Sequence, residues 1–171
     1  YRWLAGMRRD GAFLHQASLF LAELLAVDTT PKPCVAECAQ AESRAFDILE
    51  RQLARSIPTM RLERVPIRAE IAGHPYFSRL YYLGGGEPSK AHVESAYEGR
   101  CNLFGSIIAP RPDAPTLAFN AHIDVVPPYL PPRVIGGEVH GRGSADDKGG
   151  CAAVVLALQM LESVAARFGV R

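Results

Sequence analysis

The chain has 171 residues, of which 48% are hydrophobic and 22% are charged. These values are typical of a soluble globular domain with one sizeable core, and they argue against two complete domains. The formal net charge is +1, and the 19 basic residues are scattered along the chain. We therefore expect neither a nucleic-acid partner nor binding to an anionic membrane surface.

The four cysteines, Cys34, Cys38, Cys101 and Cys151, are expected to be reduced thiols, because no secretory signal precedes them and the size does not demand disulfides. Cys34 and Cys38 could form half of a metal site, but no second pair completes it, so small buried side chains are expected. The apolar run 151–158 is far shorter than the ~20 residues that span a bilayer. The sequence thus predicts a cytoplasmic protein.

The first part of the chain predicts two helices and a strand. Apolar residues recur at helical spacing over residues 10–27, and Pro31 stops that pattern. A second amphipathic helix is predicted for residues 34–55. Residues 59–67 are predicted to be a bulged edge strand, because the apolar phase changes within them and Pro66 cannot donate a backbone hydrogen bond.

The second part predicts strands at residues 79–83, 101–109 and 117–121. The last is a continuous apolar run, which is typical of a strand buried on both faces. Residues 134–140 are expected to form a short hairpin, and residues 146–167 a helix. This alternation predicts an α/β layered domain with a mixed, largely parallel sheet flanked by helices.

Candidate metal ligands come directly after the central strand and directly before the last helix. His122 ends the run 117–121, Asp124 comes two residues later, and Asp146 and Asp147 lie at the start of the helix. Neutral imidazole and carboxylate are both good zinc ligands, and a zinc-bound histidine is usually oriented by a carboxylate. We expect His122 and Asp146 to meet as metal ligands, with Asp124 orienting the imidazole and Asp146 bridging two ions.

The segments AHIDVVPP (121–128) and GRGSADDKGG (141–150) resemble the paired signatures of the zinc aminoacylase, carboxypeptidase G and succinyl-diaminopimelate desuccinylase family of metallopeptidases. The resemblance implies that His122 ligates one zinc, that Asp146 bridges both, and that Asp124 supports His122. It also implies a cis Asp146–Asp147 peptide bond and a turn at residues 28–31 near the active-site rim. Two zinc ions are implied, with cobalt or manganese as substitutes, and so is a small N-acyl amino acid or peptide substrate.

The chain departs from this family after Asp146. Family members carry a Glu-Glu pair a few dozen residues later, which supplies the general base and a zinc ligand. Glu162 comes too early and has no second Glu beside it. His140 is not expected to be a ligand, because an aromatic residue usually packs at that position in the family. The resemblance implies that residues 1–171 are the N-terminal portion of a catalytic domain, inactive alone, with the rest of that domain and a lid domain absent.

Two functions therefore remain open. The first is a zinc-dependent metallohydrolase that cleaves amide or peptide bonds in N-acyl amino acids or short peptides, present here as an incomplete chain. The alternative is a non-catalytic fragment or descendant that keeps the fold and acts by binding or assembly. In either case uncovered apolar surface is expected to favour a homo-oligomer or association with the missing part of the domain. His74 and His92 are expected to have no functional role.

Overall fold

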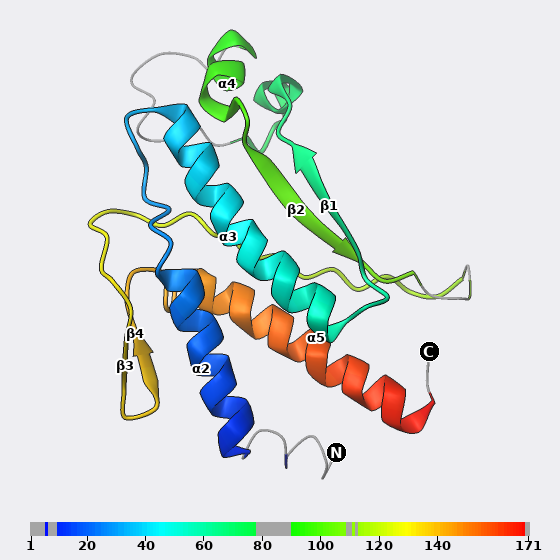
Figure 1. Cartoon of the computed structure of the whole chain (residues 1–171). Coiled ribbons are helices and arrows are strands. Elements are labelled where there is room, and N and C mark those ends of the chain that lie inside the picture. The colour runs from blue at the N-terminus through cyan, green and yellow to red at the C-terminus, as the bar shows by residue number, and fades with distance from the viewer. Residues whose placement is uncertain (1–5, 7–9, 78–89, 109–110, 112, 170–171) are drawn as a thin grey trace.

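The computed structural model describes residues 6, 10–77, 90–108, 111 and 113–169. Three long helices pack together, and two small antiparallel sheets accompany them (Figure 1). The strand predicted at residues 79–83 and the side chain of His92 lie outside the described residues. The architecture is thus a small α/β arrangement in which helices supply most of the core.

The three helices form where the sequence predicts them. Helix α2 spans Gly11–Leu25 and begins after Asp10, whose carboxylate accepts two backbone N–H bonds as an N-cap. Helix α3 spans Val35–Ser56, and helix α5 spans Lys148–Phe168. Each predicted range is confirmed to within less than one turn, because all three helices carry a stripe of apolar residues that packs inward.

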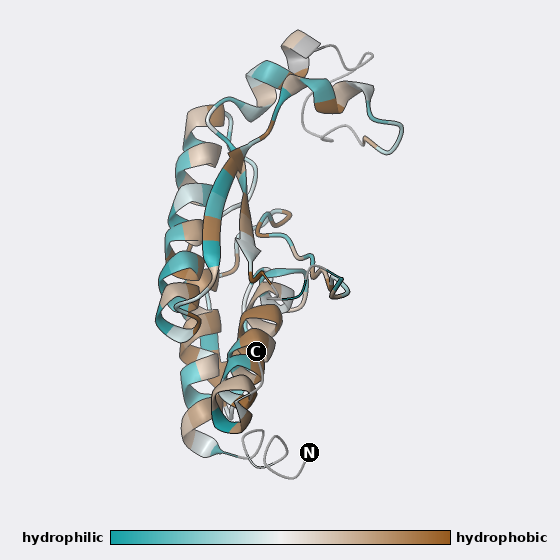
Figure 2. Cartoon of the chain, turned by 90° about the vertical axis from the view of Figure 1, so that its right-hand side faces the viewer, coloured by the Kyte–Doolittle hydropathy of each residue, from teal (hydrophilic) through white to brown (hydrophobic). Residues whose placement is uncertain are grey.

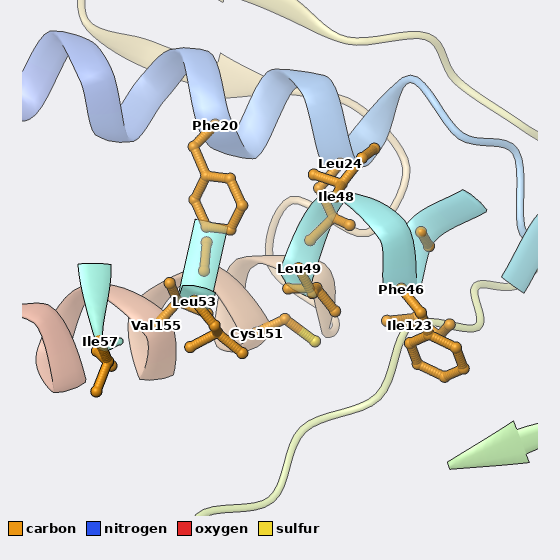
Figure 3. Packing of buried hydrophobic residues seen from close by; sticks show 12 residues of the cluster. Phe20, Leu24, Phe46, Ile48, Leu49, Leu53, Ile57, Ile123, Cys151 and Val155 are labelled. Atoms are coloured by element: carbon orange, nitrogen blue, oxygen red, sulfur yellow. The ribbon is translucent and has the colours of Figure 1, made fainter. Parts of the chain in front are cut away.

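One hydrophobic core joins these helices (Figure 3). Ile123 enters it from the extended segment directly after His122, so the core also fixes the chain beside the candidate ligands. The labelled core side chains come from α2, α3 and the residue directly after α3, α5 and this segment: Phe20, Leu24, Phe46, Ile48, Leu49, Leu53, Ile57, Ile123, Cys151 and Val155. The arrangement places the start of α5 against residue 123.

Strand β1 (Arg61–Pro66) pairs antiparallel with β2 (Cys101–Ser106). The register runs without interruption from Arg61 opposite Ser106 to Pro66 opposite Cys101. The bulge predicted for residues 59–67 is therefore wrong. Pro66 occupies the last position of the ladder, where its missing N–H disturbs the pairing least. Short helices η1 (Ala69–Gly73) and α4 (Lys90–Tyr97) lie at that end of the sheet.

The second sheet is the predicted hairpin. Strand β3 (Arg133–Ile135) pairs with β4 (Glu138–His140). Gly136 and Gly137 connect them with φ angles of +59° and +86°. Two successive positive φ angles are what a tight two-residue hairpin turn requires, and glycine adopts them without steric cost.

The predicted central strand at residues 117–121 is not observed. The segment has no regular secondary structure, no described strand pairs with it, and Leu117 and Phe119 are 75% and 49% exposed. The expectation of burial on both faces is wrong here, because such burial requires neighbouring strands and a covering layer. The described residues contain antiparallel pairs alone, so the mixed, largely parallel sheet is not observed either.

Helix α5 carries more apolar surface than this core covers. It packs against α2 and α3, yet only 17% of the residues in its most apolar 18-residue stretch are buried. Figure 2 shows the hydrophobic colour along this helix. By length and composition α5 could cross a membrane, a property that core helices of soluble proteins share. Its first residue, Lys148, is fully buried, which ties this end of the helix into the core.

Candidate metal centre

His122 lies between two carboxylates that come from different parts of the chain. Its Nε2 is 3.2 Å from Oδ1 of Asp146, and its Nδ1 is 3.4 Å from Oδ1 of Asp124. The backbone carbonyl of Asp124 is nearer to Nδ1, at 3.1 Å. The structure therefore brings together the three residues singled out in the sequence, and a main-chain oxygen as well as a carboxylate can orient the imidazole.

The His122–Asp146 pair has the spacing of two ligands on one ion. Donors that bind a tetrahedral zinc ion at about 2.0–2.2 Å lie roughly 3.3–3.5 Å apart. The two side chains are 50% and 87% exposed, so an ion can reach both. Catalytic zinc sites typically use three protein ligands. In the part of the chain that the structure describes, no group of three His, Cys, Asp or Glu side chains could hold an ion. The pair fits half of a metal site.

The first turn of α5 holds the backbone of His122. Asp147 Oδ2 accepts the N–H of His122 at 3.2 Å, and the thiol of Cys151 donates to the His122 carbonyl at 3.3 Å. Burial raises the pKa of the Cys151 thiol to about 12, so it stays a neutral donor. The Asp146–Asp147 peptide bond is cis, which confirms that prediction. The carboxylates of Asp146 and Asp147 have different partners. Asp146 faces the imidazole of His122, and Asp147 binds the His122 backbone.

Glycines in the segment 141–150 permit this close packing. A Cβ atom at Gly150 would collide with the carboxylate of Asp147, and one at Gly149 would collide with the backbone carbonyl of Ser144. Both positions lie in the first turn of α5, directly after the carboxylates. Glycine at position 150 thus leaves room for the Asp147 carboxylate, and glycine at position 149 leaves room for the Ser144 carbonyl.

The turn after α2 contacts the other side of the candidate site. The hydroxyl of Thr29 donates to the Ile123 carbonyl at 2.5 Å, and the Val125 N–H donates to the Thr29 carbonyl at 3.4 Å. Thr29 is 5% exposed. These two bonds hold the backbone on both sides of Asp124. The turn at residues 28–31 therefore lies beside the His122 pair, as the sequence resemblance implied.

Asp28 stabilises this turn. Its carboxylate accepts hydrogen bonds from the Thr30 N–H, the Thr30 hydroxyl and the Lys32 ammonium. Partial burial acts to raise the pKa of Asp28, but the hydrogen bonds from Lys32 and Thr30 outweigh it. The pKa of this carboxyl consequently lies below its ordinary value, and the group is an anion at neutral pH.

Lys148 was not identified as a site residue from the sequence. Its side chain is fully buried, and Nζ donates to the carbonyls of Leu24 at 3.2 Å and Val27 at 2.6 Å. Burial lowers the pKa of its ammonium to about 8. One sequence signal could have pointed to it. A lysine in the first turn of an apolar helix opposes the helix dipole, so it needs a partner elsewhere.

An apolar groove of about 1080 Å³ has His122 in its wall. It runs between α3, β2, α5 and the segment 116–126, and its lining includes Phe46, Leu103 and Phe119. Thr29, His122 and Asp124 contribute polar groups to its wall. Of the two candidate ligands, His122 therefore borders this large apolar surface.

The remaining candidate residues lie outside this pair. His140 Nε2 lies 3.3 Å from Oε2 of Glu138, in the hairpin that it shares with His140, and the Nδ1 atom of His74 accepts the N–H of Tyr76 at 3.3 Å. The four cysteines are free thiols. Cys38 and Cys151 are buried, whereas Cys34 is exposed at the start of α3, so its expected burial is wrong. An N-cap position lies outside the helix and faces solvent.

A family model described as Peptidase family M20/M25/M40 matches residues 118–168. The match covers less than a third of the chain, but it contains His122, Asp124, Asp146 and all of α5. It supports the broad metallopeptidase family and suggests a peptidase-type hydrolase, and peptidases of that family generally use divalent metals. No solved structure matches the chain.

Proposed function

We propose that this chain is part of a zinc-dependent hydrolase that cleaves amide or peptide bonds in N-acyl amino acids or short peptides. One observation carries the proposal: Nε2 of His122 faces Oδ1 of Asp146 at 3.2 Å, inside the segment that the peptidase family model matches. An imidazole and a carboxylate at this spacing are a donor set suited to zinc. Bound zinc supplies Lewis acidity, which activates water and polarises a carbonyl.

The residues of this chain would hold and orient. His122 would bind one ion through Nε2, while Nδ1 stays on the Asp124 backbone carbonyl and carboxylate. Asp146 would bridge two ions, since one of its oxygens faces His122 and the side chain is 87% exposed. Asp124 would act as the positioning carboxylate. The remaining ligands and the general base would come from residues other than the described ones.

The proposal is tested by measuring bound zinc after dialysis of the full-length protein. His122→Ala and Asp146→Ala should each lose zinc. Their zinc affinity should fall by more than about 10–100-fold, which is the cost of removing a residue that orients a metal ligand. His140→Ala is the matched control, because His140 is similarly exposed and also faces a carboxylate. Equal zinc retention in the His122 and His140 variants would contradict the assignment.

The alternative function, binding or assembly without catalysis, is favoured by a different observation. Leu117 and Phe119 are exposed in the wall of the apolar groove, and most residues in the apolar 18-residue stretch of α5 are not buried. Apolar surface of this kind commonly marks an interaction site. Phe119→Glu should weaken self-association in sedimentation experiments and leave zinc content unchanged. Unaltered association would argue against assembly through this face.

A further inference from the structure

The C-terminal end of α2 contacts the segment that carries Asp146. The last carbonyls of a helix have no partner within it, and they form the negative end of its dipole. Lys148 Nζ donates to two carbonyls at this end, on Leu24 and Val27. Because Lys148 is only two residues after Asp146 and fully buried, this contact fixes where the Asp146 backbone leaves the core.

The same end of α2 contacts the segment that carries His122. Thr29 lies two residues after Val27, and its hydroxyl and carbonyl bind the backbone of Ile123 and Val125. Ile123 is the residue directly after His122. Residues 24–29, which we call the α2 bracket, thus bind both chain segments of the candidate pair, and these segments are far apart in sequence.

We infer that the α2 bracket sets the distance between His122 and Asp146, and that Lys148 and Thr29 are positioning residues for this pair. The inference rests on the proposed function, in which the pair binds zinc. His122 and Asp146 are half to largely exposed, so packing of their own side chains does not fix their geometry. Their separation therefore depends on backbone contacts, in which the α2 bracket acts together with the direct bonds from Asp147 and Cys151 to the His122 backbone.

Tyr129 provides a matched comparison. Its hydroxyl donates to the carbonyls of Leu25 and Ala26, at 3.3 and 3.1 Å, so it binds the same helix end as Lys148. It lies after the proline pair 127–128 and adjoins neither candidate ligand. Removal of its hydroxyl should therefore weaken the capping of α2 without releasing either member of the pair.

The experiment uses the full-length protein with Lys148→Met, Thr29→Val, Tyr129→Phe and the core variant Val155→Ala. In metal-free protein, the ¹⁵N NMR signals of the His122 imidazole should shift in the first two variants and stay in place in the last two. Zn²⁺ affinity, measured by competition with a chromophoric chelator, should fall about 10–100-fold in Lys148→Met and Thr29→Val. The double variant should lose less than the product of the two effects, because either substitution alone already detaches the α2 bracket from one of the two segments.

The outcomes separate the two proposals. Suppose that the wild type binds zinc but that Lys148→Met and Thr29→Val leave both the imidazole signals and the zinc affinity unchanged. That result would overturn the inference and leave the proposed function standing. Losses in Val155→Ala or Tyr129→Phe as large as those in Lys148→Met would overturn it too, since general destabilisation would then explain them. A wild type that binds no zinc overturns the proposed function, and the metal-free imidazole signals then decide the positioning role. If Lys148→Met does not fold, the nearly isosteric Thr29→Val decides.

Discussion

Two halves of one segment behave differently although their residue types are alike. Residues 117–120 are exposed, and no described strand pairs with them. Residues 123–125 are bound to Thr29, and Ile123 and Val125 are buried. Burial is thus decided by which elements the fold brings alongside, and the half next to His122 is the one that α2, α3 and α5 enclose.

Alanine substitutions in the two halves should show the largest difference. Ile123→Ala should lower the free energy of unfolding by about 2–5 kcal/mol, because Ile123 is 8% exposed and belongs to the core. Leu117→Ala should change it by less than about 0.5 kcal/mol, since Leu117 is 75% exposed. Urea unfolding measures both. Similar losses would show that residues 117–120 are covered in solution.

A smaller effect is expected where α5 begins. Gly149→Ala should cost about 1–3 kcal/mol, because its Cβ would collide with the backbone carbonyl of Ser144. The same substitution should also reduce zinc content, since the collision displaces the turn that carries Asp146. Gly11→Ala is the control: no atom lies within 4 Å of its Cβ, and a gain of about 0.4–1 kcal/mol is expected. An undisturbed Gly149→Ala variant would mean that the turn adjusts freely.

The smallest effect concerns the turn that carries Thr29. The pKa of Asp28 is below its unfolded-state value of 3.8, so near that pH the native state binds fewer protons than the unfolded state. Its contribution to stability is therefore present above pH 3.8 and is lost as the pH falls further. Asp28 and Lys32 are one third and one quarter exposed, which limits the contribution to about 1 kcal/mol or less.

Asp28→Asn should accordingly be less stable than the wild type at pH 7 by about 1 kcal/mol or less, and the difference should shrink in acid. Chemical denaturation at several pH values is the measurement. Lys32→Met should reproduce much of the loss, since it removes the cationic partner. A difference that persists undiminished in acid would assign the effect to the hydroxyl and amide bonds of Thr30 instead.

The long helices were predictable because each has its own repeating apolar stripe, and the hairpin because Gly136 and Gly137 can adopt the positive φ angles of a tight turn. The failures involve partners. The run 117–121 has the composition of a buried strand, but composition does not say which strand lies beside it. The change of apolar phase before Pro66 indicates a bulge, but the register with β2 runs through that change without interruption.

The sequence by itself determined the local elements and, through the two signature segments, which residues to consider as ligands. The tertiary structure alone decided that Lys148 is buried and that Thr29 supports the backbone beside His122. Lys148 bonds to carbonyls 121 and 124 residues earlier in the chain. Contacts over such separations leave no periodic trace in the sequence, because they depend on how helices pack and not on the spacing of residues within one helix.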